Sequence, residues 1–357
     1  MKTYVKFIVN IFLKSFLNMF IIMFSLVFIL NLLSELDFFK QTEVDTYLPI
    51  YLALLNTPSL IFEMLPFIFL LSTQVFFINL FRNNEIQVLK YSGLKNINII
   101  KILCYITFVI GLVVIIFLYN LSASLKNVYL EQKSSYTSDD KYLAVITNNG
   151  LWIKDKIDNK TLIINSSKIE PNFLIETFIS EFDENYEIIR NIKSNKINIE
   201  KNKWVIFDAK IFKDNVIVNK DFLEIESNFN YEKIQSLFSI LSSLSILELF
   251  ELKKNYGLLG YSTVEVKVHI QKLISYPIYF LFMTIFSCII MFNTKNLENK
   301  TFKISIGLFS SVIIYYINNF FYVLGNTERI PIFVAVWIPL VILGLVVALM
   351  TNRINEK

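Results

Sequence analysis

The chain has 357 residues, of which 54% are hydrophobic and 34 are phenylalanine, and its mean hydropathy is +0.52. This composition excludes an ordinary soluble protein and indicates a membrane protein. The net charge of +4 is small, and the two cysteines, Cys104 and Cys288, both lie inside apolar runs, which argues against a disulfide framework.

Six apolar runs are long enough to cross a lipid bilayer, which takes about 20 helical residues. Three precede a long polar stretch and three follow it. The runs span residues 15–36, 58–81, 97–120, 273–292, 304–325 and 331–350. The first run is longer than the core of a signal peptide and no small-residue cleavage site follows it, so we expect an uncleaved first membrane helix.

Basic residues are concentrated in the connections on one side of these runs. The short loops on the opposite side carry only Lys40 and Arg329. By the positive-inside rule, both termini are expected in the cytoplasm and residues 122–268 outside it. The residues on the basic side are Lys2, Lys6, Lys14, Arg82, Lys90, Lys95, Lys101, Lys295, Lys300, Lys303, Arg353 and Lys357.

The polar stretch changes from helical to alternating periodicity. Asn148-Asn149-Gly150 lies between the apolar segments 142–147 and 151–154, which is a strong hairpin signal. Further β-like runs, separated by turns such as 183–185 and 214–215, lie at 162–164, 174–180, 187–192, 196–199, 204–207, 211–212, 216–218 and 223–225. Many short strands without helices between them predict a sandwich or jelly roll. Residues 239–255 then predict an amphipathic helix that ends near Gly257.

The expected fold class is therefore an α+β membrane protein with six transmembrane helices. Residues 1–121 are expected to hold the first three helices and 269–357 the last three. The β-jellyroll domain and a connecting helix occupy 122–268.

The stretch 83–93, on the basic side, is a candidate docking helix. No glycine in the chain is followed by lysine, so a Walker A phosphate loop is absent and any nucleotide is hydrolysed by another chain. Asn83 or Asn84 can begin a helix that Gly93 ends. Glu85 and Lys90 both complement the helix dipole, and Ile86 and Leu89 share one face. A partner protein or the membrane surface could equally cover that face.

Other residues that could carry chemistry are few. Glu63, Lys272, Glu35 and Asp37 lie near the ends of spans, where solvated charges are expected. His269 is the only histidine and has no neighbouring ligands, so no metal site and no cofactor are predicted. Tyr315, Tyr316 and Asn319, with Asn318, form a polar aromatic patch in the fifth span. The patch could line a substrate path, but helix packing explains it equally well.

Several motifs, in order along the chain, resemble those of the LptF/LptG family of lipopolysaccharide export permeases, and look more like LptG. They are Pro66-Phe67-Ile68-Phe69-Leu70-Leu71-Ser72, Asn84-Glu85-Ile86 through Ser92-Gly93, Gly150-Leu151-Trp152-Ile153-Lys154-Asp155, Gly260-Tyr261-Ser262-Thr263 with Val268-His269 and Pro277, Ile330-Pro331, and Trp337-Ile338-Pro339. Ser72 stands where the family has glycine.

The resemblance implies a permease that extracts lipopolysaccharide from the bacterial inner membrane. It implies an LptF-type partner permease, an LptB-type ATPase dimer, an LptC-type single-span protein and a periplasmic LptA-type bridge, with no nucleic acid and no catalytic residue of its own. Glu85 matches the residue that docks in the ATPase, and the first and fifth helices match lateral gates. The family places basic residues at the outer end of the first helix, but here Lys40 is the only one among acidic neighbours.

Two other functions fit the topology alone. A membrane-anchored sensor or scaffold would bind a ligand through its outer domain without ATP. An intramembrane enzyme would need a catalytic pair, and no such pair is evident in the spans. Co-purification of an ATPase would separate the permease from the sensor.

Overall fold

The computed structural model describes residues 3–40, 44–45, 47–134, 136, 151–157, 160–170, 172–213, 216–231, 234, 240–259, 262–293 and 300–355. The chain forms two compact units, one of Met1–Tyr129 with Val264–Lys357 and one of Leu130–Thr263. Three long apolar helices precede a six-stranded antiparallel sheet and three follow it, which confirms the expected fold class.

The first unit is the membrane bundle, and each predicted span lies inside one of its long helices. The third span continues through a π-helical segment, η1, into α5, so it is longer than the apolar run alone predicts. The elements are α1 (Thr3–Phe38), α2 (Tyr47–Arg82), α3 (Glu85–Tyr91), α4 (Asn96–Val113), η1 (Val114–Tyr119), α5 (Asn120–Ser134), α8 (Val264–Asn293), α9 (Lys300–Asn326) and α10 (Ile332–Asn355).

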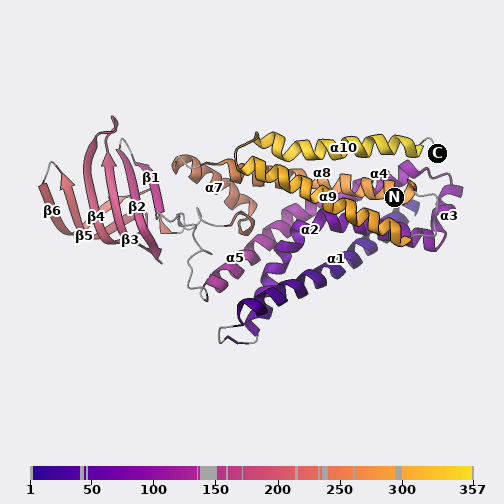
Figure 1. The fold of residues 1–357 in the computed structure, drawn as a ribbon, viewed down its shortest axis with the longest axis horizontal. Coiled ribbons are helices and arrows are strands. Elements are labelled where there is room, and N and C mark those ends of the chain that lie inside the picture. The colour runs from indigo at the N-terminus through magenta and orange to yellow at the C-terminus, as the bar shows by residue number, and fades with distance from the viewer. Residues whose placement is uncertain are drawn as a thin grey trace. The chain divides into compact units, whose positions relative to one another are not determined.

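Helices α2 and α8 form the centre of the bundle (Figure 1). In their apolar windows 72% and 67% of residues are buried, whereas the figure for α1 and α9 is 17%. Lipid is as apolar as the side chains, so membrane helices associate through close packing and hydrogen bonds. Ser287 accordingly donates to the carbonyl of Leu70 (2.9 Å), and the hydroxyls of Thr107 and Thr284 lie 3.2 Å apart.

Helix α9 approaches the rest of the bundle closely at two glycines. At Gly307, an added Cβ would lie 2.1 Å from Nε2 of Gln74, which donates to the carbonyl of Lys303. At Gly325, an added Cβ would lie 2.5 Å from Cβ of Ala335 in α10. Between these contacts much of α9 is uncovered within this chain.

The second unit is built on a sheet whose strands are hydrogen-bonded in sequence order. These are β1 (Leu151–Ile157), β2 (Lys160–Glu170), β3 (Phe173–Phe182), β4 (Ile188–Asn198), β5 (Lys203–Lys213) and β6 (Val216–Glu226). The turn at 183–185 is confirmed, because Oδ1 of Asp183 accepts from the backbone N–H groups of Asn185 and Glu187. The predicted hairpin loop at 142–150 and the turn at 214–215 lie outside the described residues.

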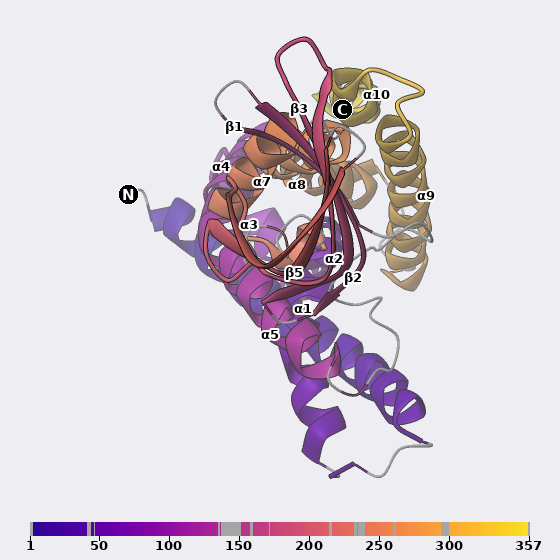
Figure 2. The same cartoon turned by 90° about the vertical axis from the view of Figure 1, so that its left-hand side faces the viewer.

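The strands β4 and β5 are longer than the sequence predicts. Each of them contains two predicted runs, and the sheet bends between those runs. The predicted runs 187–192 and 196–199 both fall on β4, and 204–207 and 211–212 both fall on β5. Between such runs the pairing skips a position in neighbouring strands, and Glu176 and Asp208 adopt positive φ there. An interruption of this kind bends a strand and increases its twist. Figure 2 shows the strands curving.

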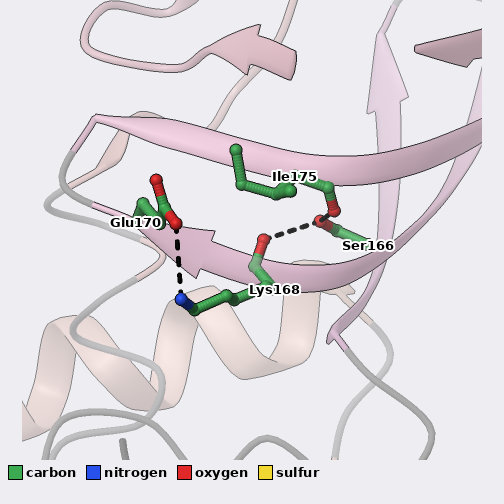
Figure 3. Close-up of polar contacts among 4 residues, drawn as sticks. All are labelled: Ser166, Lys168, Glu170 and Ile175. Atoms are coloured by element: carbon green, nitrogen blue, oxygen red, sulfur yellow. Dashed lines mark hydrogen bonds and ion pairs between the residues drawn. The ribbon is translucent and has the colours of Figure 1, made fainter. Parts of the chain in front are cut away.

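Buried hydroxyl groups compensate for the interrupted ladder at this bend. Oγ of Ser166 lies 3.0 Å and 2.8 Å from the carbonyl oxygens of Lys168 and Ile175 (Figure 3). Ser194 repeats the arrangement with the carbonyls of Lys196 (2.9 Å) and Phe207 (2.6 Å). Each serine hydroxyl has one hydrogen and so donates to one of its two carbonyls at a time, which partly replaces the regular pairing lost at the bend.

The concave face of the sheet is apolar. A row of isoleucines crosses five strands in direct register, and each member is nearly inaccessible to water. The row is Ile153, Ile164, Ile179, Ile192 and Ile211, and it ends at Val218 of β6, which is 43% exposed. The apolar interior is therefore closed at β1 and opens toward β6.

The segment after β6 returns to the first strand. The buried carboxylate of Asp155 in β1 accepts hydrogen bonds from the Ser227 hydroxyl (2.8 Å) and from the backbone N–H (2.9 Å) and side-chain amide (2.8 Å) of Asn228. Nε1 of Trp204 donates to the carbonyl of Phe229 (2.6 Å). These hydrogen bonds hold the segment after β6 against β1 and β5.

The connecting helix differs from its prediction at both ends. Residues Leu241–Ser243 form a short 3-10 turn, η3, and the helix α7 spans Ile246–Leu259. It begins at a capping box, in which Ser245 N–H donates to Glu248 (2.7 Å) and Glu248 N–H donates to Ser245 (3.4 Å). Gly257 does not end the helix, because one glycine costs only about 1 kcal/mol in a helix interior.

Candidate functional site

The short helix α3 lies at the end of the bundle that holds both chain termini (Figure 1). Basic residues of neighbouring elements share that end, among them Lys14, Arg82, Lys95 and Lys101. The first residue of α3, Glu85, is half-buried. Its Oε1 accepts from the Asn83 side chain (3.3 Å), and its Oε2 is buried with no hydrogen-bond partner among the described residues.

The predicted apolar face of α3 is covered by this chain. Ile86 and Leu89 are 6% and 7% exposed, and α3 packs against α2. They need no partner protein to cover them. The outward face instead presents Val88 and Tyr91, which are 62% and 89% exposed, beside the exposed Lys90.

Both ends of α3 are fixed by its backbone. Gly93 adopts φ +81°, and the N–H groups of Gly93 and Leu94 donate to the carbonyls of Lys90 and Leu89 (2.9 and 3.1 Å). This is a Schellman ending, as the glycine predicts. Asn84 occupies the N-cap, as one of the two predicted positions, but at φ 56° and without a side-chain capping bond. The rigid ending holds α3 in one orientation against α2.

The tyrosine patch of α9 faces outward. Tyr315 and Tyr316 are 52% and 66% exposed and Asn319 is exposed, whereas Asn318 is buried and donates to the carbonyl of Ile314 (3.0 Å). Within this chain, packing therefore explains Asn318 but not the two tyrosines. Both α9 and α1 offer a surface that lipid or another chain must cover.

An apolar groove of about 340 Å³ separates α1 from the third span. It lies beside η1, where the π-helical turns widen the helix. Segments of this kind occur frequently at functional sites. Its walls include Phe16, Leu17 and Phe20 of α1 and Val114, Phe117 and Leu118 of η1. The groove matches the chemistry of a hydrocarbon chain.

The C-terminal end of α1 offers little positive charge. Nζ of Lys40 lies 3.9 Å from the Asp37 carboxylate, and both side chains are highly exposed. Glu35 is not solvated as predicted, because it is 2% exposed and accepts a hydrogen bond from the Tyr129 hydroxyl (2.8 Å). Lys40 therefore forms only a weak, solvent-exposed pair with Asp37, and it is the one basic residue among acidic neighbours in this stretch of the sequence.

The sequence did not predict a second group of polar and charged residues, which lies in the half of the bundle away from α3. Nε2 of His269 lies 3.0 Å from the Tyr119 hydroxyl, and Lys126 of α5 is an electrostatic neighbour of Glu63 of α2. Lys272 of α8 lies over a tyrosine ring of α9. These residues come from separate spans, and one sequence does not show which spans are neighbours.

Comparison with known proteins identifies a family. Residues 6–353 match the model of the lipopolysaccharide export system permease LptF/LptG. No individual curated protein matches the chain. Because the match covers nearly the whole chain, the chain belongs to the LptF/LptG family and is a non-catalytic permease subunit of a lipopolysaccharide export transporter.

Proposed function

We propose that this LptF/LptG permease works with a second permease, of the LptF type, and with an LptB-type ATPase dimer that binds α3. The resemblance of residues 150–155 to the LptG motif supports the LptG position for this chain. The observation that carries the proposal is α3 itself, a helix with an exposed Val88/Tyr91 face and a carboxylate oxygen that has no hydrogen-bond partner among the described residues. The sequence holds no phosphate loop, so the motor is a separate chain.

The basic end of the bundle is assigned to the cytoplasm. Lysines and arginines gather where α1 begins, α2 ends and α4 begins, which follows the positive-inside rule. This orientation places α3 beside a cytoplasmic ATPase. It places the β domain in the periplasm of a bacterial inner-membrane protein.

The proposed route for lipopolysaccharide begins at the uncovered helices α1 and α9, which would face the partner permease as gates. Moving acyl chains from lipid into water costs about 0.8 kcal/mol per CH₂, so a multi-chain lipid must stay covered. Beyond the membrane, the proposed cover is the apolar interior of the β domain, entered at β6, where Val218 is 43% exposed.

The open side of the β domain supports a docking edge for the periplasmic bridge. Strand β6 pairs only with β5 among the described strands, and Val216, Ile217 and Phe222 are each more than half exposed. An unpaired edge with apolar side chains is suited to strand addition by another β protein. We assign this edge to an LptC-type or LptA-type jelly roll.

The coupling role of Glu85 is tested by Glu85→Ala in the purified full chain with the chains that accompany it. Loss of a charge-assisted contact is expected to lower ATP-driven release of lipopolysaccharide from vesicles about tenfold or more. Glu200→Ala is the matched control, since Glu200 is exposed in the β domain and its side chain makes no hydrogen bond or ion pair among the described residues. Release from Glu85→Ala at the wild-type rate would remove Glu85 from the coupling site. A preparation that contains no ATPase would favour the sensor interpretation.

The orientation is tested by single cysteines in a chain whose two native cysteines are replaced by serine. A maleimide that cannot cross membranes is expected to label Trp152→Cys in spheroplasts. It is expected to label Tyr91→Cys only after the membrane is opened. Both side chains are well exposed, so accessibility is set by the membrane. The opposite pattern would overturn the assignment of both sides.

A further inference from the structure

Lys272 is a charged residue of α8 that directly precedes the apolar run 273–292. It lies eight residues into α8, roughly 12 Å from the start of the helix at 1.5 Å per residue. It is half-buried, and the ion pairs among the described residues do not include it. A half-buried charge at the edge of an apolar span is costly to desolvate, so the groups that its ammonium contacts decide its role.

Two aromatic rings hold the ammonium group of Lys272 in place. Its Nζ lies 5.1 Å from the ring centroid of Tyr322 in α9 and 5.9 Å from that of Tyr276 in α8. Cation–π contacts of this length favour the charged amine and limit its freedom. Tyr276 is also an electrostatic neighbour of Tyr315, so Lys272 lies close to the exposed tyrosine patch of α9.

Ionisable groups of other helices lie near Lys272. Glu63 of α2 acts electrostatically on Lys126 of α5, while Lys126 and Lys272 are both neighbours of His269. Lys272 therefore belongs to a group of ionisable residues that come from three helices. In contrast, the C-terminal end of α1 has Lys40 beside Asp37 and a buried Glu35.

We propose that Lys272, framed by Tyr276 and Tyr322, binds a phosphate group on the head of the transported glycolipid. The inference rests on the proposed function. A lysine ammonium binds phosphate as a point charge, and a tyrosine hydroxyl can donate a further hydrogen bond. The site is partly exposed and built from one lysine, so it holds the head group briefly and releases it. The acyl chains of the same lipid lie against the apolar surfaces of the spans.

The test measures binding of bisphosphorylated lipid A to the purified full chain with its accompanying chains, by native mass spectrometry. Lys272→Gln is expected to raise the Kd about tenfold, the change for losing one charge-assisted contact. Lys272→Arg keeps the charge and is expected to stay within about threefold of wild type. Lys267→Gln is the matched control, because Lys267 lies on the same helix about 140° around the axis from Lys272.

Two further ligands identify the source of the phosphate. With dephosphorylated lipid A, the wild type and Lys272→Gln are expected to bind equally, since the contact is to phosphate. Inorganic phosphate in excess is expected not to displace the lipid. Displacement by inorganic phosphate alone would assign the site to a free anion and overturn the lipid head group as its ligand.

The outcomes separate this inference from the function on which it rests. Failure of the wild type to bind lipid A would contradict the proposed function. Normal binding by the wild type and by Lys272→Gln would overturn this inference alone, and would make Lys272 a lysine that merely reaches the membrane surface. Normal binding by Lys272→Gln with loss in Lys267→Gln would move the site to another face of α8.

Discussion

The membrane bundle and the β domain bury similar side chains but use polar groups in opposite ways. In the bundle, hydroxyls and an amide join helices, as in Ser287 to Leu70 and Gln74 to Lys303. In the sheet, the buried hydroxyls of Ser166 and Ser194 leave the strand order unchanged and satisfy carbonyls at the bend. Buried polar groups therefore join particular helices in the membrane bundle, whereas in the β domain they stabilise the bend of the sheet.

The difference follows from the solvent around each region. Burying isoleucine removes apolar surface from water, at about 25 cal/mol per Å², so the β domain gains stability from its concave face. Two apolar helices that meet in lipid remove no surface from water. Their association therefore gains no hydrophobic free energy and depends on close packing. The sheet should thus be sensitive to lost volume, and the bundle to added volume.

The largest effect is expected from removing volume in the sheet. Ile192→Ala leaves a cavity in the isoleucine row and is expected to destabilise the β domain by about 2–5 kcal/mol. Hydrogen exchange of the β3, β4 and β5 amides measures this loss locally. Ile188→Ala on the same strand is the control, because Ile188 is 62% exposed and its truncation is expected to cost less than about 0.5 kcal/mol. Equal protection in both variants would contradict the role of the row.

A smaller effect is expected from adding one methyl group to the bundle. In Gly325→Ala the new Cβ would meet Cβ of Ala335 at 2.5 Å, so α9 and α10 must separate, at a cost of about 1–3 kcal/mol. The thermal unfolding midpoint in detergent is expected to fall, and adding Ala335→Gly is expected to restore it.

Gly257→Ala is the control for the added methyl group. Nothing lies within 4 Å of its position, so only helix propensity changes, and stability should stay equal or rise. If Gly325→Ala left the midpoint unchanged, the two helices would not be held by this contact.

The spans could be predicted from sequence because lipid imposes a length and an apolar composition that a single run displays. The end of α3 could also be predicted, since Gly93 marks the left-handed turn there. The strands were predicted in fragments. Alternation fails where buried side chains are three residues apart, as Ser194 and Ile197 are in β4 and Ile206 and Ala209 are in β5. A run that loses its alternation reads as the end of a strand.

Less of the candidate site than of the fold could be predicted from the sequence. Ile86 and Leu89 share a face, as predicted, but only the fold shows that α2 covers it and that Val88 and Tyr91 face outward. Tyr322 lies next to Lys272 although the two are 50 positions apart in the chain, and only the packing of α8 and α9 brings them together. Local patterns carry no information about such pairs.

The hydrogen bonds of Asp155 also have a consequence for the order of events during synthesis. Its partners, Ser227 and Asn228, are 72 and 73 positions downstream. At 5–20 residues per second, the ribosome supplies them roughly 4–15 seconds after the aspartate. Until then a carboxylate destined for burial has no lasting partner and must remain hydrated. The domain can therefore close only after its last strand has been translated, by which time the first three spans have already been made.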